Sequence, residues 1–116
     1  MGYKLLIVDD DPDIIKLIGD NLEKKGFEVI VASNGREAMD KFRIHHPDLV
    51  ILDLMMPDKD GIAIFDTIKQ LSTYTRIIVY TGYQEYEKSI YARSADRFIV
   101  KGSSIEQLVE AVDELS

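Results

Sequence analysis

Short runs of apolar residues alternate along the chain with stretches in which apolar residues recur every three or four positions. The runs predict five buried strands, at residues 4–8, 28–32, 48–52, 76–80 and 97–100. Because most of these runs are apolar throughout, they are typical of parallel strands that are covered on both faces. The pattern therefore predicts strands separated by amphipathic helices.

The stretches between the strands carry apolar residues at helical spacing. These are Ile14, Ile18 and Leu22, then Ala38, Met39 and Phe42, then Ile64, Phe65 and Ile68, and finally Ile105, Leu108, Val109, Val112 and Leu115. A capping box, formed by Ser104 with Gln107 or by Ser103 with Glu106, is expected at the start of the last helix. Residues 83–95 predict only a short helix of marginal stability, because their one strong aliphatic residue is Ile90.

Five strands alternating with five helices predict an α/β fold, as a single doubly wound, flavodoxin-like domain over residues 1–116. Right-handed crossovers make the sheet parallel. The second strand begins with Glu28, and the fifth is flanked by Arg97 and Lys101, so these two strands suit the edges. The predicted order is 2-1-3-4-5, which places a ligand site at the carboxyl ends of strands one and three.

Composition narrows the range of partners. The net charge of −7 argues against nucleic acid as a direct partner, because phosphate binding requires a basic surface. No apolar run approaches the roughly 20 residues that a membrane span requires, and no signal peptide is predicted. The chain has no cysteine, which excludes disulfides and is compatible with the cytoplasm. We therefore expect a cytoplasmic protein that binds neither nucleic acid nor membranes.

Acidic residues follow two of the strands that are predicted to be central. Asp9 and Asp10 follow the first strand, and Asp53 follows the third. Clustered carboxylates repel one another, so a cation is expected, and oxygen ligands suit Mg²⁺. A carboxylate beside Mg²⁺ can act as a nucleophile and form an aspartyl phosphate. Thr81 and Lys101, which directly follow the fourth and fifth strands, could neutralise the oxygens of a transferred phosphoryl group.

With this arrangement the chain resembles the receiver domain of bacterial two-component response regulators, and it is chemotaxis-regulator-like. The matching motifs span the chain: Val8-Asp9-Asp10-Asp11-Pro12, Asp53 with Met56-Pro57 and Asp60-Gly61, Thr81-Gly82, and Lys101. The resemblance implies a signalling switch that catalyses only its own phosphorylation and dephosphorylation. It would receive a phosphoryl group from a sensor histidine kinase or a phosphotransfer protein and would control an unknown output protein.

The resemblance also implies roles for individual residues. Asp53 would be the phosphoacceptor. Asp10 would bind Mg²⁺ directly, Asp9 largely through water, and Met55 through its backbone carbonyl, with Asp53 completing the metal site. Lys101 would pair with the phosphate.

Thr81 and Phe98 would form the switch. The Thr81 hydroxyl would turn inward to a phosphoryl oxygen, and the Phe98 ring would follow it. The output surface would be built from the fourth helix, the fifth strand and the fifth helix, on a monomer or a weak dimer that forms on phosphorylation. Gly102 stands where the family usually has a proline after the lysine, so a trans or otherwise relaxed loop is expected there.

Two other functions are compatible with parts of the pattern. The fold could serve as a phosphorylation-independent docking module for another protein. A phosphotransferase of the haloacid dehalogenase kind also uses a strand-end Asp with Mg²⁺. That chemistry needs a second acid two residues after the nucleophile, where this chain has Met55.

Several other residues have simpler explanations in local structure. Asp11 is expected to cap the first helix. His45 and His46 are expected to end the second helix, where positive charge suits the helix dipole, rather than to bind a metal. Asp58 and Asp60 are expected to be solvated turn residues. Two interpretations of the tyrosines at 83, 86 and 91 stay open, as packing residues or as part of a partner surface.

Overall fold

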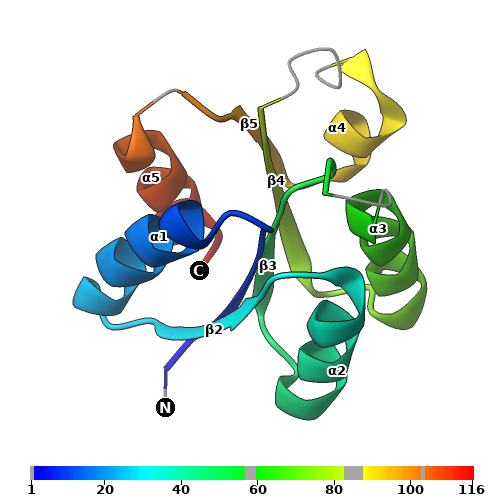
Figure 1. The fold of residues 1–116 in the computed structure, drawn as a ribbon, viewed down its shortest axis with the longest axis horizontal. Helices are drawn as coiled ribbons and strands as arrows, with labels where there is room; N and C mark the ends of the chain where they lie inside the picture. The colour runs from blue at the N-terminus through cyan, green and yellow to red at the C-terminus, as the bar shows by residue number, and fades with distance from the viewer. Residues whose placement is uncertain (1, 57–59, 83–87, 103) are drawn as a thin grey trace.

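One parallel sheet of five strands forms the centre of the protein (Figure 1). The structure is a computed structural model and describes residues 2–56, 60–82, 88–102 and 104–116. The strands are β1 (Lys4–Val8), β2 (Glu28–Ala32), β3 (Leu49–Leu52), β4 (Arg76–Thr81) and β5 (Arg97–Val100). Their order is β2-β1-β3-β4-β5, and every neighbouring pair is parallel. The predicted strand order is therefore confirmed.

Helices cover both faces of this sheet. They are α1 (Pro12–Lys24), α2 (Gly35–His45), α3 (Asp60–Leu71), α4 (Ile90–Ser94) and α5 (Ile105–Leu115). Figure 1 shows α1 and α5 on one side of the sheet, with α2, α3 and α4 on the other. The predicted doubly wound α/β fold is confirmed.

Two apolar clusters fill the space between the sheet and the helices. The α1/α5-side cluster includes Leu5, Ile7, Ile18, Leu22, Leu49, Ile51, Ile78, Tyr80, Ile99, Leu108 and Val112. The α2/α3-side cluster includes Leu6, Val8, Ala38, Phe42, Val50, Leu52, Ile64, Phe65, Ile68, Ile77 and Val79. Successive side chains of a strand point to opposite faces, so Asp9 and Asp53 continue the rows of β1 and β3 that face α1 and α5.

The ends of three helices agree with the sequence. The Asp11 side chain caps α1 by accepting a 2.9 Å hydrogen bond from the Asp13 amide. The Ser104 side chain caps α5 by accepting from the Glu106 amide at 3.1 Å, so Ser104 is the cap, whereas Ser103 lies outside the described residues. The end of α2 is also as predicted, because His45 is its last residue and His46 adopts a left-handed conformation with φ of 49°.

The start of α3 corrects one prediction. Asp60 is not a turn residue but the first residue of α3, while Pro57 and Asp58 lie outside the described residues. Asp favours turns and helix starts alike, and the residue that follows it permits the helix here. A Cβ atom on Gly61 would lie 2.1 Å from the Asp53 carbonyl oxygen, so only glycine lets α3 begin against the end of β3.

Helix α4 is as short as the sequence predicts. Its five residues are capped by Ser89, whose side chain accepts from the Ala92 amide at 3.3 Å. Tyr91 packs edge-on against Phe65, with 5.3 Å between the ring centroids. Tyr91 is therefore a packing residue, while Tyr83 and Tyr86 lie outside the described residues.

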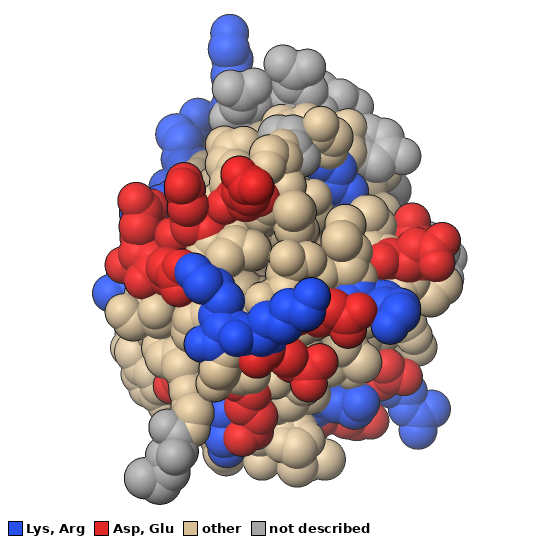
Figure 2. Space-filling view, turned by 90° about the vertical axis from the view of Figure 1, so that its left-hand side faces the viewer, with Lys and Arg blue, Asp and Glu red and all other residues tan. Residues whose placement is uncertain are grey.

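The side of the molecule formed by α1 and α5 carries charges of both signs. Figure 2 shows a group of acidic side chains there, above a band of lysine and arginine side chains. Lys25, the residue that caps the carboxyl end of α1, forms an ion pair with Asp113 of α5, which links the end of α1 to α5. In the part of the chain that the structure describes, no helix is both long and apolar enough to cross a membrane.

Candidate functional site

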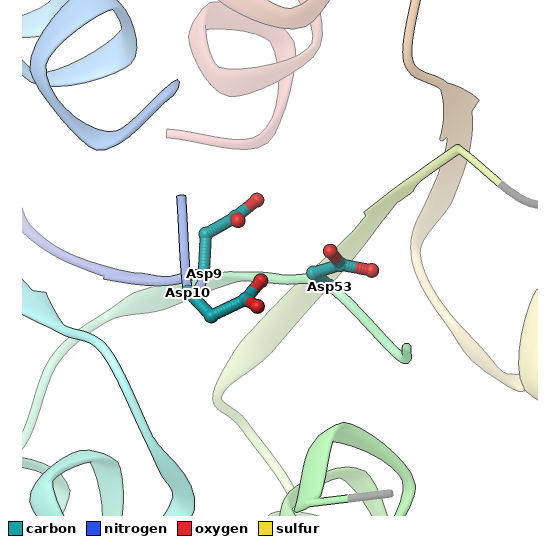
Figure 3. A group of neighbouring side chains, drawn as sticks. All are labelled: Asp9, Asp10 and Asp53. Atoms are coloured by element: carbon teal, nitrogen blue, oxygen red, sulfur yellow. The ribbon is translucent and has the colours of Figure 1, made fainter. Parts of the chain in front are cut away.

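Three carboxylates meet at the carboxyl ends of β1 and β3 (Figure 3). One oxygen from each of Asp9, Asp10 and Asp53 lies within 4.8 Å of the others. Asp9 and Asp53 are 2% and 5% exposed, whereas Asp10 is exposed to solvent. Among the described residues, this is the one cluster of acids, histidines or cysteines that could hold a metal ion. The cluster lies at the switch point of the strand order, where the sequence predicts the ligand site.

The backbone fixes the two buried carboxylates. The Asp9 amide donates to the Ala32 carbonyl oxygen at 3.2 Å, and the Asp53 amide donates to the Val8 carbonyl oxygen at 3.0 Å, so the sheet ladder continues one residue beyond each strand. Oδ1 of Asp9 accepts from the Asp11 amide at 2.9 Å. Oδ1 of Asp53 accepts from the Met55 amide at 3.0 Å. Each carboxylate thus has one oxygen held by the following turn.

Lys101 contacts the other oxygen of each buried acid. Its Nζ atom lies 2.5 Å from Oδ2 of Asp9 and 2.9 Å from Oδ2 of Asp53. The Lys101 amide donates to the Thr81 carbonyl oxygen at 2.7 Å, which fixes the base of the side chain beside β4. Gly102 has φ of 100°, and the described residues contain no cis peptide bond, as expected without a proline there. The lysine therefore reaches the acids from the rim where the sequence predicts it.

Burial and charge shift two pKa values at the site. Burial raises the pKa of Asp9 above its usual value of 3.8, and repulsion from Asp53 adds to the rise, although contacts with Lys101 and the Asp11 amide oppose it. Burial alone would lower the pKa of Lys101, but its hydrogen bonds to Asp9 and Asp53 outweigh this and raise it above 10.5. Lys101 is therefore a cation across the neutral pH range.

The charge and donor set of the site fit a divalent cation. Three carboxylates and one ammonium leave two negative charges when all four groups are ionised. All three acids offer oxygen, which is the donor that Mg²⁺ prefers. Met55 follows Asp53 by two residues, and its amide already contacts the Asp53 carboxylate. The residues present thus fit Mg²⁺, and the part of the Met55 carbonyl in binding it stays a prediction.

Thr81 and Phe98 lie on the opposite face of the sheet from Lys101. Thr81 is fully buried at the end of β4. The register pairs Val79 with Phe98 and Thr81 with Val100, so Thr81 and Phe98 point to the same face. Phe98 is half-buried against the α2/α3-side cluster, which Tyr91 of α4 also contacts. The predicted switch pair is thus on the side where α4 packs.

Residues 5–113 match the model of the response regulator receiver domain. The chain belongs to this family. It is 38% identical over 117 residues to the chemotaxis protein CheY of Bacillus subtilis, a match that covers 98% of each protein. It is also 37% identical over 103 residues to the alkaline phosphatase synthesis transcriptional regulatory protein PhoP of the same organism, a match covering 87% of this chain and 43% of that protein.

Solved structures of receiver domains have the same fold. The response regulator TrrA of Thermotoga maritima, solved in complex with Mg²⁺ and BeF, is 35% identical, with a TM-score of 0.91 and full coverage of both chains. A structure of the histidine kinase ThkA in complex with TrrA matches this receiver domain with a TM-score of 0.87 and 36% identity, over 99% of this chain and 98% of that one.

The sequence does not predict a part in the site's chemistry for two residues that lie near it. The Gly61 backbone lies directly against Asp53 and Leu54. The Tyr80 ring lies 5.9 Å from the Lys101 ammonium, measured to the ring centroid. In the sequence, Tyr80 is only one residue of a run that predicts a buried strand. The signal that identifies it is the alternation of side chains in two adjacent strands, combined with their register.

Proposed function

We propose that this receiver domain, spanning residues 1–116, is a phosphorylation-controlled switch in which Asp53 accepts a phosphoryl group from a sensor histidine kinase or a phosphotransfer protein. One observation carries the proposal. The Asp53 carboxylate is buried beside Asp9 and Asp10, with one oxygen held by the Met55 amide and the other by the Lys101 ammonium. This arrangement orients a carboxylate and supplies a cation beside the oxygen that would react.

The reaction is a displacement at phosphorus. An oxygen of Asp53 attacks the phosphorus of a phosphohistidine, the new O–P bond forms as the P–N bond breaks, and the electron pair stays on the imidazole nitrogen, which then takes up a proton. Oδ2 is the oxygen directed toward Lys101. When that oxygen becomes bonded to phosphorus, the ammonium is placed to pair with a phosphoryl oxygen instead.

Mg²⁺, when bound, would neutralise charge on the transferred phosphoryl group. Asp10 would hold it directly, since this carboxylate is exposed and within reach of the other two. Asp9 would act largely through water, because Lys101 already contacts its Oδ2. Asp53 and the Met55 carbonyl would complete the set. The similarity to TrrA, which was solved with Mg²⁺ and BeF, supports this part of the proposal.

Thr81 and Phe98 would transmit the change to the surface formed by α4, β5 and α5. The Thr81 hydroxyl would bond a phosphoryl oxygen, and the Phe98 ring would follow because both side chains share one face of the sheet. The backbone bond from Lys101 to Thr81 joins the two residues that would touch the phosphate. Phosphorylation would then favour one of two arrangements of this surface.

A kinase partner is supported by the likeness to TrrA, whose complex with the histidine kinase ThkA has been solved. The output partner would be a protein that binds the α4-β5-α5 surface. The domain would act as a monomer, or as a weak dimer on phosphorylation. It would turn over no substrate other than its own phosphodonor and phosphate.

The proposal is tested by intact-mass spectrometry after incubation with acetyl phosphate. We expect the wild type to gain the mass of one phosphoryl group with Mg²⁺ and none when the metal is chelated. Asp53→Asn should gain none, and Asp40→Asn, which changes an exposed acid of α2, should behave like the wild type. Undiminished labelling of Asp53→Asn would contradict the proposal. If the wild type accepts no phosphoryl group from either acetyl phosphate or a histidine kinase, the docking module becomes the better interpretation.

A further inference from the structure

Tyr80 of β4 and Lys101, which directly follows the adjacent strand β5, lie on the same face of the sheet. The register pairs Tyr80 of β4 with Ile99 of β5, and both residues face α1 and α5. Side chains alternate along β5, so Lys101 follows Ile99 on that face. Tyr80 is 4% exposed, so its ring is packed within the protein and is not a mobile surface group.

The ring is close enough to attract the ammonium. Nζ of Lys101 lies 5.9 Å from the centroid of the Tyr80 ring, which is within the range of a cation–π interaction. Burial raises the pKa of the Tyr80 phenol above 10.0, so the ring stays neutral at physiological pH. The ammonium therefore lies beside the carboxylates of Asp9 and Asp53 and also beside the ring of Tyr80.

The residue after Lys101 is a glycine in the left-handed conformation. Gly102 adopts φ of 100°, and, its chain neighbours aside, no atom of the described residues lies within 4 Å of the position that a Cβ on it would occupy. The side chain is long and flexible, and Asp9 and Asp53 both attract its ammonium. A ring that contacts the ammonium from the α1/α5 side limits the positions it can take. The ring adds an attraction for the ammonium that is separate from its ion pairs with the two carboxylates.

We propose that Tyr80 is a positioning residue, whose ring holds the Lys101 ammonium beside Asp53 so that the phosphoryl oxygens meet it during transfer. This inference rests on the proposed function of Asp53. It differs from a purely structural role, in which Tyr80 would only fill space within the α1/α5-side cluster. In that case the identity of the ring would affect stability and leave the reaction unchanged.

Three variants separate the two roles. Tyr80→Phe keeps the ring face, Tyr80→Leu removes it, and Ile78→Ala destabilises the same strand and cluster two residues away from the ring. Phosphorylation by acetyl phosphate with Mg²⁺ is followed over a range of donor concentrations, under conditions in which each variant is folded. We expect the rate constant at saturating donor to fall between about twofold and tenfold in Tyr80→Leu. It should stay within about twofold of the wild type in Tyr80→Phe and Ile78→Ala. The donor concentration at half-saturation should change less than the rate constant.

A second measurement reports the contact itself. Ring currents should shift the NMR signals of the Lys101 ε-methylene protons upfield, with Lys101→Ala serving to assign them. We expect the shift in the wild type and in Tyr80→Phe, and its loss in Tyr80→Leu. Equal rate constants in Tyr80→Leu and the wild type would overturn the role of Tyr80 and leave the proposed function standing. A wild type that shows the shift and takes up no phosphoryl group would instead overturn the proposed function.

Discussion

Nζ of Lys101 donates a 2.9 Å hydrogen bond to Oδ2 of Asp53, across 48 residues of sequence. The same ammonium lies 2.5 Å from Oδ2 of Asp9. One lysine thus bridges the two buried carboxylates, and it occupies the oxygens that a metal ion and a phosphoryl group would use.

Removal of the lysine should strengthen binding of Mg²⁺. In Lys101→Ala the site loses its competing positive charge, so we expect Mg²⁺ affinity to rise by about threefold to tenfold, which corresponds to roughly 0.7–1.4 kcal/mol. Isothermal titration calorimetry measures this. Lys16→Ala removes an exposed lysine of α1 and should leave the affinity unchanged. Weaker Mg²⁺ binding in Lys101→Ala would argue against competition for Asp9 and Asp53.

The same substitution should separate phosphorylation from its effect on the surface. Asp53 remains in place in Lys101→Ala, so we expect some phosphorylation by acetyl phosphate to persist. The change at the α4-β5-α5 surface should be lost, because no ammonium pairs with the phosphate. Amide NMR shifts of α4 residues such as Tyr91 and Ala92, compared before and after phosphorylation, measure the coupling. Wild-type shifts in the phosphorylated variant would speak against a part for Lys101 in the switch.

Two glycines near the site should respond differently to alanine. A Cβ on Gly61 would lie 2.1 Å from the Asp53 carbonyl oxygen, so Gly61→Ala must displace the start of α3 or the loop that carries Asp53. We expect the free energy of unfolding to fall by about 2 kcal/mol or more. Apart from its chain neighbours, no atom of the described residues lies within 4 Å of the Cβ position of Gly82, so Gly82→Ala should change stability by less than about 0.5 kcal/mol. Urea denaturation compares the two, and equal losses would contradict the close approach at Gly61.

Mg²⁺ should stabilise the folded protein through the acidic cluster. At free Mg²⁺ ten times its dissociation constant, we expect the free energy of unfolding to rise by about 1.4 kcal/mol. Asp10→Asn should lose most of this gain, and Asp40→Asn, an exposed change in α2, should keep it. Thermal or urea unfolding at matched ionic strength measures the effect. A full gain in Asp10→Asn would exclude Asp10 as a ligand.

Stability should decline at alkaline pH, partly through Lys101. Its hydrogen bonds to Asp9 and Asp53 raise its pKa in the folded state above the usual 10.5, so the folded protein keeps this proton when the unfolded chain has lost it. The stabilisation is therefore complete below about pH 10.5 and is lost as pH rises through the folded pKa. The pKa of Tyr80 is raised above 10.0 by burial and acts in the same direction.

Urea unfolding at several pH values between about 8 and about 11.5 measures this decline in the free energy of unfolding, because lysine and tyrosine side chains titrate in that range. Lys101→Met should show a shallower decline than the wild type, whereas Lys16→Met, at an exposed position of α1, should follow the wild type. Parallel curves for Lys101→Met and the wild type would show that the lysine gains no proton affinity from its two acidic partners.

The placement of the site residues follows from the sequence because it depends on strand ends. Asp9, Asp10, Asp53, Thr81 and Lys101 each end or follow an apolar run, and the carboxyl ends of parallel strands share one edge of the sheet. The helix caps at Asp11 and Ser104 follow from local residue preferences.

The remaining features depend on contacts that local patterns do not encode. Asp60 is consistent with either a turn or a helix start, and the contact of Gly61 with Asp53 decides between them. Tyr80 belongs to an apolar run, and its position beside the Lys101 ammonium becomes evident only when the register of β4 and β5 is known. The bridge from Lys101 to Asp9 as well as Asp53 depends on where a long side chain lies, which strand order alone leaves open.

The most direct test locates the phosphoryl group on the chain. After reaction with acetyl phosphate and Mg²⁺, borohydride reduces an aspartyl phosphate to homoserine, and peptide mass spectrometry identifies the position. We predict homoserine at position 53, with aspartate retained at positions 9 and 10. Homoserine at position 9 or 10, or its absence from a protein that carries a phosphoryl group, would contradict Asp53 as the acceptor.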